Sequence, residues 1–292
     1  MGRPIGSQPS GGVMQSSVER TQRLAWEANR FFKQGKLPDP FTCARLEKGA
    51  EQAKVTDPLN AHLILARLAS MQQQPQRMRG HHLSIINLTP DRPKSHVDYA
   101  DSLMKLGFFS EAQERLRIAN ELLPDDGGIL QNLVRGSMLA GRFREAAITM
   151  DQLFDLDRQV TIRQYHFIRE ALELVQKREI SDDALEALQK SASGYLHQQG
   201  HFTSGSLRAP SVQMELVNPG AGVTLPGGGR ITGLFLRWGL QLEAEKAQIG
   251  TLNQGLQAHL KDQVFDEALM GTVRMRFTPW RNGTHGTNAF FS

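Results

Sequence analysis

The sequence predicts an α-helical solenoid of paired helices, followed by a small strand-rich C-terminal domain of the α+β or all-β class. Two observations predict the solenoid: the chain repeats itself at an offset of 34 residues, and apolar residues recur at helical spacing between breaks at Pro and Gly. A third observation predicts the strands, because apolar and polar residues alternate after residue 211, as in a sheet with one buried face.

The repeat is clearest between residues 103–116, LMKLGFFSEAQERL, and residues 137–150, SMLAGRFREAAITM. Five positions are identical in the two segments: Met104/Met138, Gly107/Gly141, Phe109/Phe143, Glu111/Glu145 and Ala112/Ala146. A repeated unit of this length cannot bury its apolar face alone, so it is expected to stack on its neighbours.

Pro90 and Pro124 share the same spacing and define the frame of three units, 59–92, 93–126 and 127–160. In this frame the chain resembles the tetratricopeptide repeat, a helix–turn–helix unit of 34 residues. The resemblance is carried by small residues where the two helices cross and by Gly where the first helix ends. These positions are Ala66, Ala100, Val134, Ala112, Ala146, Gly107 and Gly141. The first unit matches least, since it has Gln73, Pro75 and Met78 at key positions.

Other segments surround these units. Residues 1–16 are rich in Gly, Pro, Ser and Gln, which predicts a flexible tail. The helical pattern extends from 17 to 197, in helices of roughly 12–16 residues that need neighbours to bury their apolar stripes. Residues 198–210 are predicted as a linker.

The strand-rich domain is expected over residues 211–292, with strands at 211–217, 231–243 and 272–277. Each strand places its apolar residues on one face. Between the last two strands, apolar residues at helical spacing predict a helix: Ile249, Leu252, Leu256, Leu260 and Val264.

Composition limits the classes of protein. The net charge of +4 over 292 residues is too small to indicate nucleic-acid binding by itself. Cys43 is the only cysteine, which excludes an intrachain disulfide and a cysteine-based zinc cluster. The start of the chain has no apolar core of a secretory signal, and no apolar run approaches a membrane span. We expect a cytoplasmic protein with no metal and no cofactor.

The resemblance to tetratricopeptide proteins implies a concave groove, lined by the first helix of each unit, that holds a partner peptide. At one groove position it places Arg67, Asp101, Arg135 and Arg169. Near a second groove position it places Met71, Met104 and Met138. The guanidinium groups of these arginines and the flexible side chains of these methionines suit an acidic or carboxylate-ended segment of a partner. Two alternatives remain: these charges pair with one another without a ligand, or the C-terminal domain fills the groove.

A basic stretch near the C-terminus permits a second hypothesis. Arg274, Arg276, Trp280 and Arg281 could stack on and pair with single-stranded nucleic acid. An Arg–x–Arg alternation is more typical of a solvated strand whose charges discourage aggregation, so nucleic acid is disfavoured.

We therefore predict a protein–protein interaction module: an adaptor, co-chaperone or assembly factor with no catalytic residues. One alternative is an enzyme with a catalytic C-terminal domain and substrate-recruiting repeats. Another is a structural subunit of a larger phage or secretion assembly. The sequence does not indicate an oligomeric state.

Overall fold

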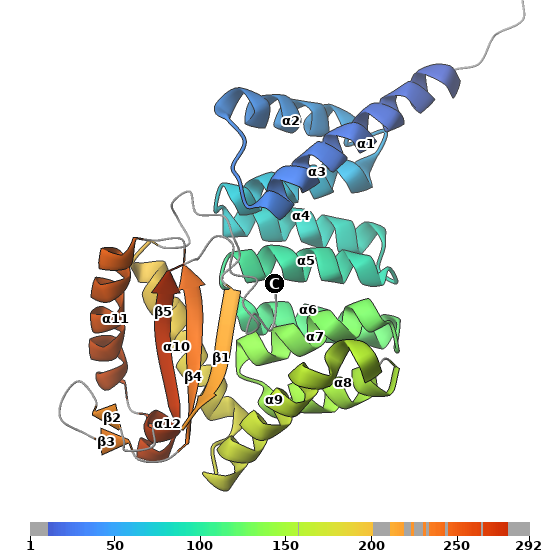
Figure 1. The fold of residues 1–292 in the computed structure, drawn as a ribbon. Coiled ribbons are helices and arrows are strands. Elements are labelled where there is room, and N and C mark those ends of the chain that lie inside the picture. Colours follow the sequence, from blue (N-terminus) through green and yellow to red (C-terminus); the bar gives the residue numbers. More distant parts are fainter. Residues whose placement is uncertain are drawn as a thin grey trace, which may run out of the picture. The chain divides into compact units, whose positions relative to one another are not determined.

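The computed structural model describes residues 11–156, 158–200, 211–218, 223–224, 230–231, 234–242, 245–263 and 265–279. The chain forms two compact units, Met1–Pro90 and Asp91–Ser292 (Figure 1). Within the described part of the chain, no helix combines the length and the apolar character that a membrane crossing requires.

The first unit contains four helices: α1 (Gly11–Gln34), α2 (Pro40–Ala53), α3 (Pro58–Met71) and α4 (Pro75–Leu88). Helix α3 is central, since it packs against the other three. Proline opens α2, α3 and α4, where its missing N–H costs nothing. The carboxylate of Asp39 accepts a hydrogen bond from Thr42 N at 3.0 Å and so caps α2.

Helix α1 begins earlier than predicted. Residues 11–16, which composition assigns to a flexible tail, belong to this helix, while residues 1–10 lie outside the described residues. The physical reason is cooperativity: once residues 17–34 are helical, each added residue gains one hydrogen bond without a new nucleation cost.

The second unit begins with six helices: α5 (Pro93–Lys105), α6 (Phe109–Leu122), α7 (Gly127–Ala140), α8 (Phe143–Leu156), α9 (Arg158–Lys177) and α10 (Asp182–Gln198). From α5 to α9 each helix packs on the next, which is the stacking of a solenoid. Together with the α3–α4 hairpin, these helices match the predicted units, so the α-solenoid fold class is confirmed.

The repeated residues perform the predicted local roles. Gly107 and Gly141 have φ values of +76° and +84°, so each ends the first helix of its hairpin in the left-handed conformation that glycine adopts without strain. Ala112 and Ala146 are completely buried where the second helix packs closely. Small side chains are required there because a larger one would separate the helices.

The strand-rich region is of the α+β class. Strands β1 (Ser211–Val217), β4 (Phe235–Leu242) and β5 (Val273–Pro279) form a sheet in the order β1-β4-β5. The β1–β4 pair is antiparallel and the β4–β5 pair is parallel, a pairing that needs a long connection. Helices α11 (Lys246–Lys261) and α12 (Glu267–Thr272) supply it, and β2 (Val223–Thr224) pairs with β3 (Arg230–Ile231).

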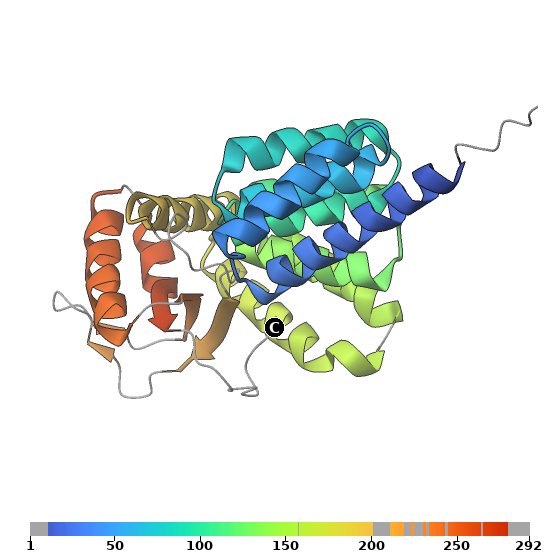
Figure 2. The same cartoon turned by 90° about the horizontal axis from the view of Figure 1, so that it is seen from above.

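The predicted apolar faces of β4 and β5 coincide. Trp238 is in register with Met275, so these two side chains share one face of the sheet. Helix α10 covers this face, lying behind the strands in Figure 1 and above them in Figure 2. The rings of Tyr195 on α10 and Phe277 on β5 stack with centroids 6.3 Å apart.

Helix α11 closes the outer edge of the sheet. The side chain of Asn253 accepts a hydrogen bond from Phe277 N at 2.7 Å and donates one to Phe277 O at 2.8 Å. An edge strand with open backbone groups is prone to pair with other chains, and this amide satisfies that edge instead. Glycine has a low helix propensity, so Gly255 is unfavourable for α11 itself. A larger residue is excluded there, because its side chain would collide with the Tyr195 hydroxyl of α10.

Candidate functional site

In the first unit, the structure places Arg67 and Met71 in the core. Arg67 is only 5% exposed, and its guanidinium carbon lies 4.3 Å from the ring centroid of Phe32. Met71 is also buried. Both side chains therefore contribute to packing within this unit.

In the second unit, Arg135 and Asp101 lie close enough to interact. Burial lowers the pKa of Arg135, and the carboxylate of Asp101 opposes that shift. Met104 and Met138 are buried. Arg169 is exposed and forms an ion pair with Asp151 of α8. Contact of these residues with a partner stays a prediction.

Arg274 and Arg276 lie on β5, on the face of the sheet opposite to Trp238 and α10. Trp280 and Arg281 lie outside the described residues. The Arg–x–Arg alternation therefore belongs to a strand, and this strand lies at the edge of the sheet.

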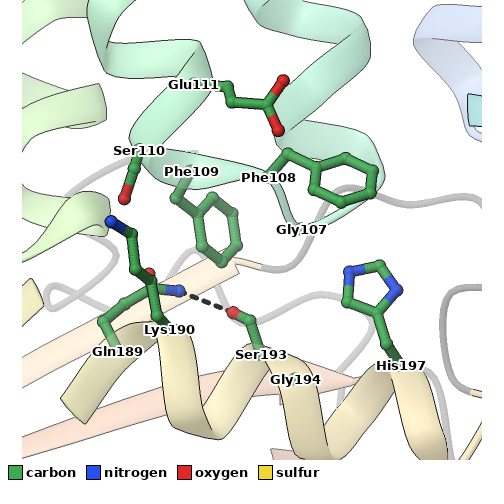
Figure 3. Close-up of a pocket in the computed structure, with 10 residues that line it drawn as sticks. All are labelled: Gly107, Phe108, Phe109, Ser110, Glu111, Gln189, Lys190, Ser193, Gly194 and His197. Atoms are coloured by element: carbon green, nitrogen blue, oxygen red, sulfur yellow. Dashed lines mark hydrogen bonds between the residues drawn. The ribbon is translucent and has the colours of Figure 1, made fainter. Parts of the chain in front are cut away.

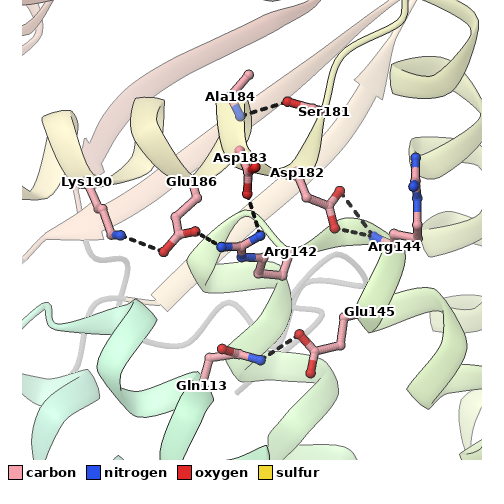
Figure 4. A network of polar contacts seen from close by, with 10 residues as sticks. All are labelled: Gln113, Arg142, Arg144, Glu145, Ser181, Asp182, Asp183, Ala184, Glu186 and Lys190. Atoms are coloured by element: carbon pink, nitrogen blue, oxygen red, sulfur yellow. Dashed lines mark hydrogen bonds and ion pairs between the residues drawn. The ribbon is translucent and has the colours of Figure 1, made fainter.

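A polar network fixes the start of α10 to the turn between α7 and α8 (Figure 4). Arg142, one residue after Gly141, pairs with Asp183 at 2.7 Å and with Glu186. Arg144 N donates a hydrogen bond to the Asp182 carboxylate at 3.1 Å. Ser181 caps the start of the helix, because its Oγ accepts a hydrogen bond from Ala184 N at 3.1 Å.

Glu186 is the buried centre of this network. Burial works to raise its pKa, but the hydrogen bond from Lys190 and the charges of Arg142 and Lys190 outweigh burial, and the pKa of Glu186 is lowered. Its carboxylate is therefore ionised at neutral pH and holds two cations, Arg142 and Lys190. Such a buried, paired charge strongly fixes the position of α10.

A cavity of about 430 Å³ opens between the α5–α6 turn and α10 (Figure 3). The ring of Phe108 stacks on the imidazole of His197, with centroids 5.0 Å apart and an interplanar angle of 27°. Burial lowers the pKa of His197, so its ring is neutral at neutral pH. The lining residues are Gly107, Phe108, Phe109, Ser110, Glu111, Gln189, Lys190, Ser193, Gly194 and His197.

One wall of this pocket, which we call the aromatic pocket, is open at Gly194. A β-carbon at Gly194 would meet no atom within 4 Å. Beside it, Gln189 Nε2 donates a hydrogen bond to Ser193 Oγ at 2.6 Å. Aromatic rings with a polar rim are suited to holding an apolar side chain while its backbone finds hydrogen bonds at the rim.

The described residues offer little for catalysis. Among them, no three His, Cys, Asp or Glu side chains gather as metal ligands would. Ser191 Oγ lies 3.0 Å from His259 Nε2, but both residues sit within helices and their contact joins α10 to α11. In the described part of the chain, no contact to a carboxylate orients His259 as a catalytic base would require.

The sequence pattern does not indicate the aromatic pocket. It identifies Gly107 as a helix end but gives no reason to join residues 107–111 with residues 189–197, which lie far along the chain. One feature of the sequence could have indicated the pocket: Phe108 and Phe109 follow the turn glycine directly. Two adjacent rings cannot both point into one core, so one of them must contact another part of the chain or a partner.

Comparisons with known proteins show no family for this chain. No protein-family model and no curated protein matches it. A solved structure of pilF from Pseudomonas aeruginosa, reported for its functional characterization, is 15% identical, covering 64% of this chain and 89% of that chain, with a TM-score of 0.41. A likeness this weak indicates nothing about function, and the solenoid fold rests on the helices and turns described above.

Proposed function

We propose that this chain is a protein–protein interaction module whose aromatic pocket anchors an apolar side chain of a partner. The observation that carries the proposal is the pocket itself: its rings come from a hairpin turn of the solenoid and from α10. Interfaces draw most of their binding energy from a few side chains that fill such pockets.

The rigidity of the pocket supports this function. One wall is the α5–α6 turn, and the other is α10, which Arg142 and Glu186 hold in place. A preformed site costs less ordering entropy on binding, so more of the contact energy appears as affinity. The volume also falls within the range of about 300–1,000 Å³ that is usual for ligand pockets.

The concave groove is the second surface on which a partner segment could lie, as the resemblance to tetratricopeptide repeats implies. Its support is weaker, because Met104 and Met138 are buried and Arg169 already pairs with Asp151. The roles of adaptor, co-chaperone and assembly factor all require the same property, a stable surface that recognises another protein. The aromatic pocket is the sharper target for an experiment.

The test is affinity purification of the tagged full-length chain from its native host, comparing Gly194→Leu with the unaltered protein. The leucine occupies the pocket, and we expect partner affinity to fall about tenfold or more, or about 1.4 kcal/mol. The matched control is Gly250→Leu on α11, where a β-carbon also meets no atom within 4 Å.

A partner captured by the unaltered chain and by Gly250→Leu, but lost from Gly194→Leu, would support the proposal. The loss is then measured with purified partner by isothermal titration calorimetry. If all three proteins bind the same partners with equal affinity, the pocket is not the anchor.

A further inference from the structure

The face of the sheet opposite to α10 carries three arginines from two neighbouring strands. Arg237 of β4 is in register with Arg274 of β5, and Arg276 follows two residues later on the same face. Arg276 is in register with Gly239, which has no side chain to shield it. We call Arg237, Arg274 and Arg276 the arginine face. Figure 1 views the sheet from this side, with α10 behind it.

The charges of the arginine face are only partly compensated. Glu215 of β1 pairs with Arg237. In the part of the chain that the structure describes, Arg274 and Arg276 have no ion pair, and the buried Arg274 Nε has no hydrogen-bond partner. Burial, followed by the charge of Arg276, lowers the pKa of Arg237. Holding like charges together is unfavourable, and an anion bound between them would relieve this repulsion.

We propose that the arginine face binds an acidic segment of a protein partner through its carboxylates. Charge complementarity supports this occupant, and the Glu215–Arg237 pair shows that a carboxylate fits among these guanidinium groups. Arginine presents a planar fork of donors that matches a carboxylate in two parallel hydrogen bonds. The proposal rests on the proposed interaction function and adds the chemistry of the partner.

Single-stranded nucleic acid fits this face less well. Proteins that bind it without sequence preference offer exposed aromatic rings on which bases stack. Among the described residues of the arginine face, the aromatic side chain is Phe235, which is 4% exposed, and Trp238 points to the opposite face. Among the residues that the structure describes, this face offers guanidinium groups and no accessible ring, which favours carboxylates held on a peptide.

The experiment measures binding of a fluorescein-labelled oligoglutamate peptide to the full-length chain by fluorescence anisotropy. The double variant Arg274→Gln/Arg276→Gln should bind about five- to tenfold more weakly, as expected for the loss of two exposed charge pairs. The matched control is Arg178→Gln/Lys261→Gln, which removes two exposed charges, one directly after α9 and one at the end of α11. Its binding should stay within about twofold of the unaltered chain.

A second variant should increase, rather than decrease, the affinity of the arginine face for oligoglutamate. Glu215→Gln releases Arg237 from its internal partner, so oligoglutamate should bind about two- to fivefold more tightly. Unfolding cannot produce this gain in affinity. The Glu215→Gln result therefore remains informative even if the double variant is destabilised. Binding should also weaken as NaCl rises, because exposed charge contacts are screened.

Three outcomes overturn the proposal: no binding of oligoglutamate, an equal loss in the control, or a weakening by Glu215→Gln. Tighter binding of oligothymidylate with the same dependence on Arg274 and Arg276 would assign the face to nucleic acid instead. Gly194→Leu should leave oligoglutamate binding unchanged, since the aromatic pocket is a separate site. A failure of the pocket proposal is therefore distinguishable from a failure here.

Discussion

Gly141 and Leu185 meet backbone against backbone: a β-carbon on Gly141 would lie 2.7 Å from the carbonyl carbon of Leu185. Gly141 ends α7 in the left-handed conformation, and Leu185 lies in the first turn of α10. The residue that closes a repeat hairpin is therefore also the point where α10 docks. Two independent constraints, conformation and space, favour glycine at this position.

Gly141→Ala should destabilise the second unit by about 2–4 kcal/mol, because alanine is strained at this φ and its methyl group displaces α10. Urea denaturation followed by circular dichroism measures the change. Gly250→Ala is the control: it lies in a helix with open space around it and should add about 0.5–1 kcal/mol of stability. Equal stability of Gly141→Ala and the unaltered chain would show that α10 does not dock here.

Arg142→Gln should loosen α10, because it removes one of the two cations that hold the buried Glu186. We expect a loss of about 1–3 kcal/mol in unfolding free energy, and faster amide hydrogen exchange in residues 182–198. Asp183→Asn serves as the comparison, since the Asp183 side chain is 84% exposed. Its effect should stay within about 0.5 kcal/mol. Similar exchange rates in Arg142→Gln and the unaltered chain would contradict the role of this contact.

The features that could be predicted from sequence are those with a local cause. Gly107 and Gly141 recur because a left-handed helix end requires glycine, and Ala112 and Ala146 recur because two helices cross closely there. Alternation in the strands also has a local cause, since it shows which face of each strand is buried. For these features the sequence pattern and the structure agree.

The features that sequence analysis misses depend on distant packing. The apolar stripe of α10 resembles that of any solenoid helix, and no pattern indicates that it packs on α7 and α11. The aromatic pocket forms only because of that docking. The exposure of a single side chain depends on distant packing as well. Arg67 stands at a predicted groove position, but its side chain is buried against the ring of Phe32.

Ala146→Leu should destabilise the α7–α8 hairpin by about 1–3 kcal/mol through overpacking, because Ala146 is completely buried. Thermal melting followed by far-ultraviolet circular dichroism measures the change. Ala258→Leu, at an exposed position of α11, makes the same chemical change and should leave the melting temperature almost unaltered. Equal melting temperatures of Ala146→Leu and Ala258→Leu would show that the crossing tolerates a large side chain.

Two histidines of the first unit share one hydrogen bond. His62 Nδ1 on α3 lies 3.1 Å from His81 Nδ1 on α4, so one ring must donate and the other must accept. This is possible only while the accepting ring is neutral. Burial, followed by the positive charges of His62, Lys54 and Arg77, lowers the pKa of His81 to about 4. Burial also lowers the pKa of His62.

The first unit should therefore lose stability as the pH falls. An unfolded histidine takes up a proton near its ordinary pKa of 6.5, whereas folded His81 resists protonation until about pH 4, so acid favours the unfolded state between these values. Allowing for solvent screening of a partly exposed ring, we expect a loss of about 1–2 kcal/mol. Hydrogen exchange in residues 58–88, corrected for the intrinsic effect of pH, measures the loss. His81→Gln should abolish most of this loss of stability. The control His166→Gln, at an exposed position, should leave the loss unchanged. If the unaltered chain and both variants lose stability equally, His81 is not the cause.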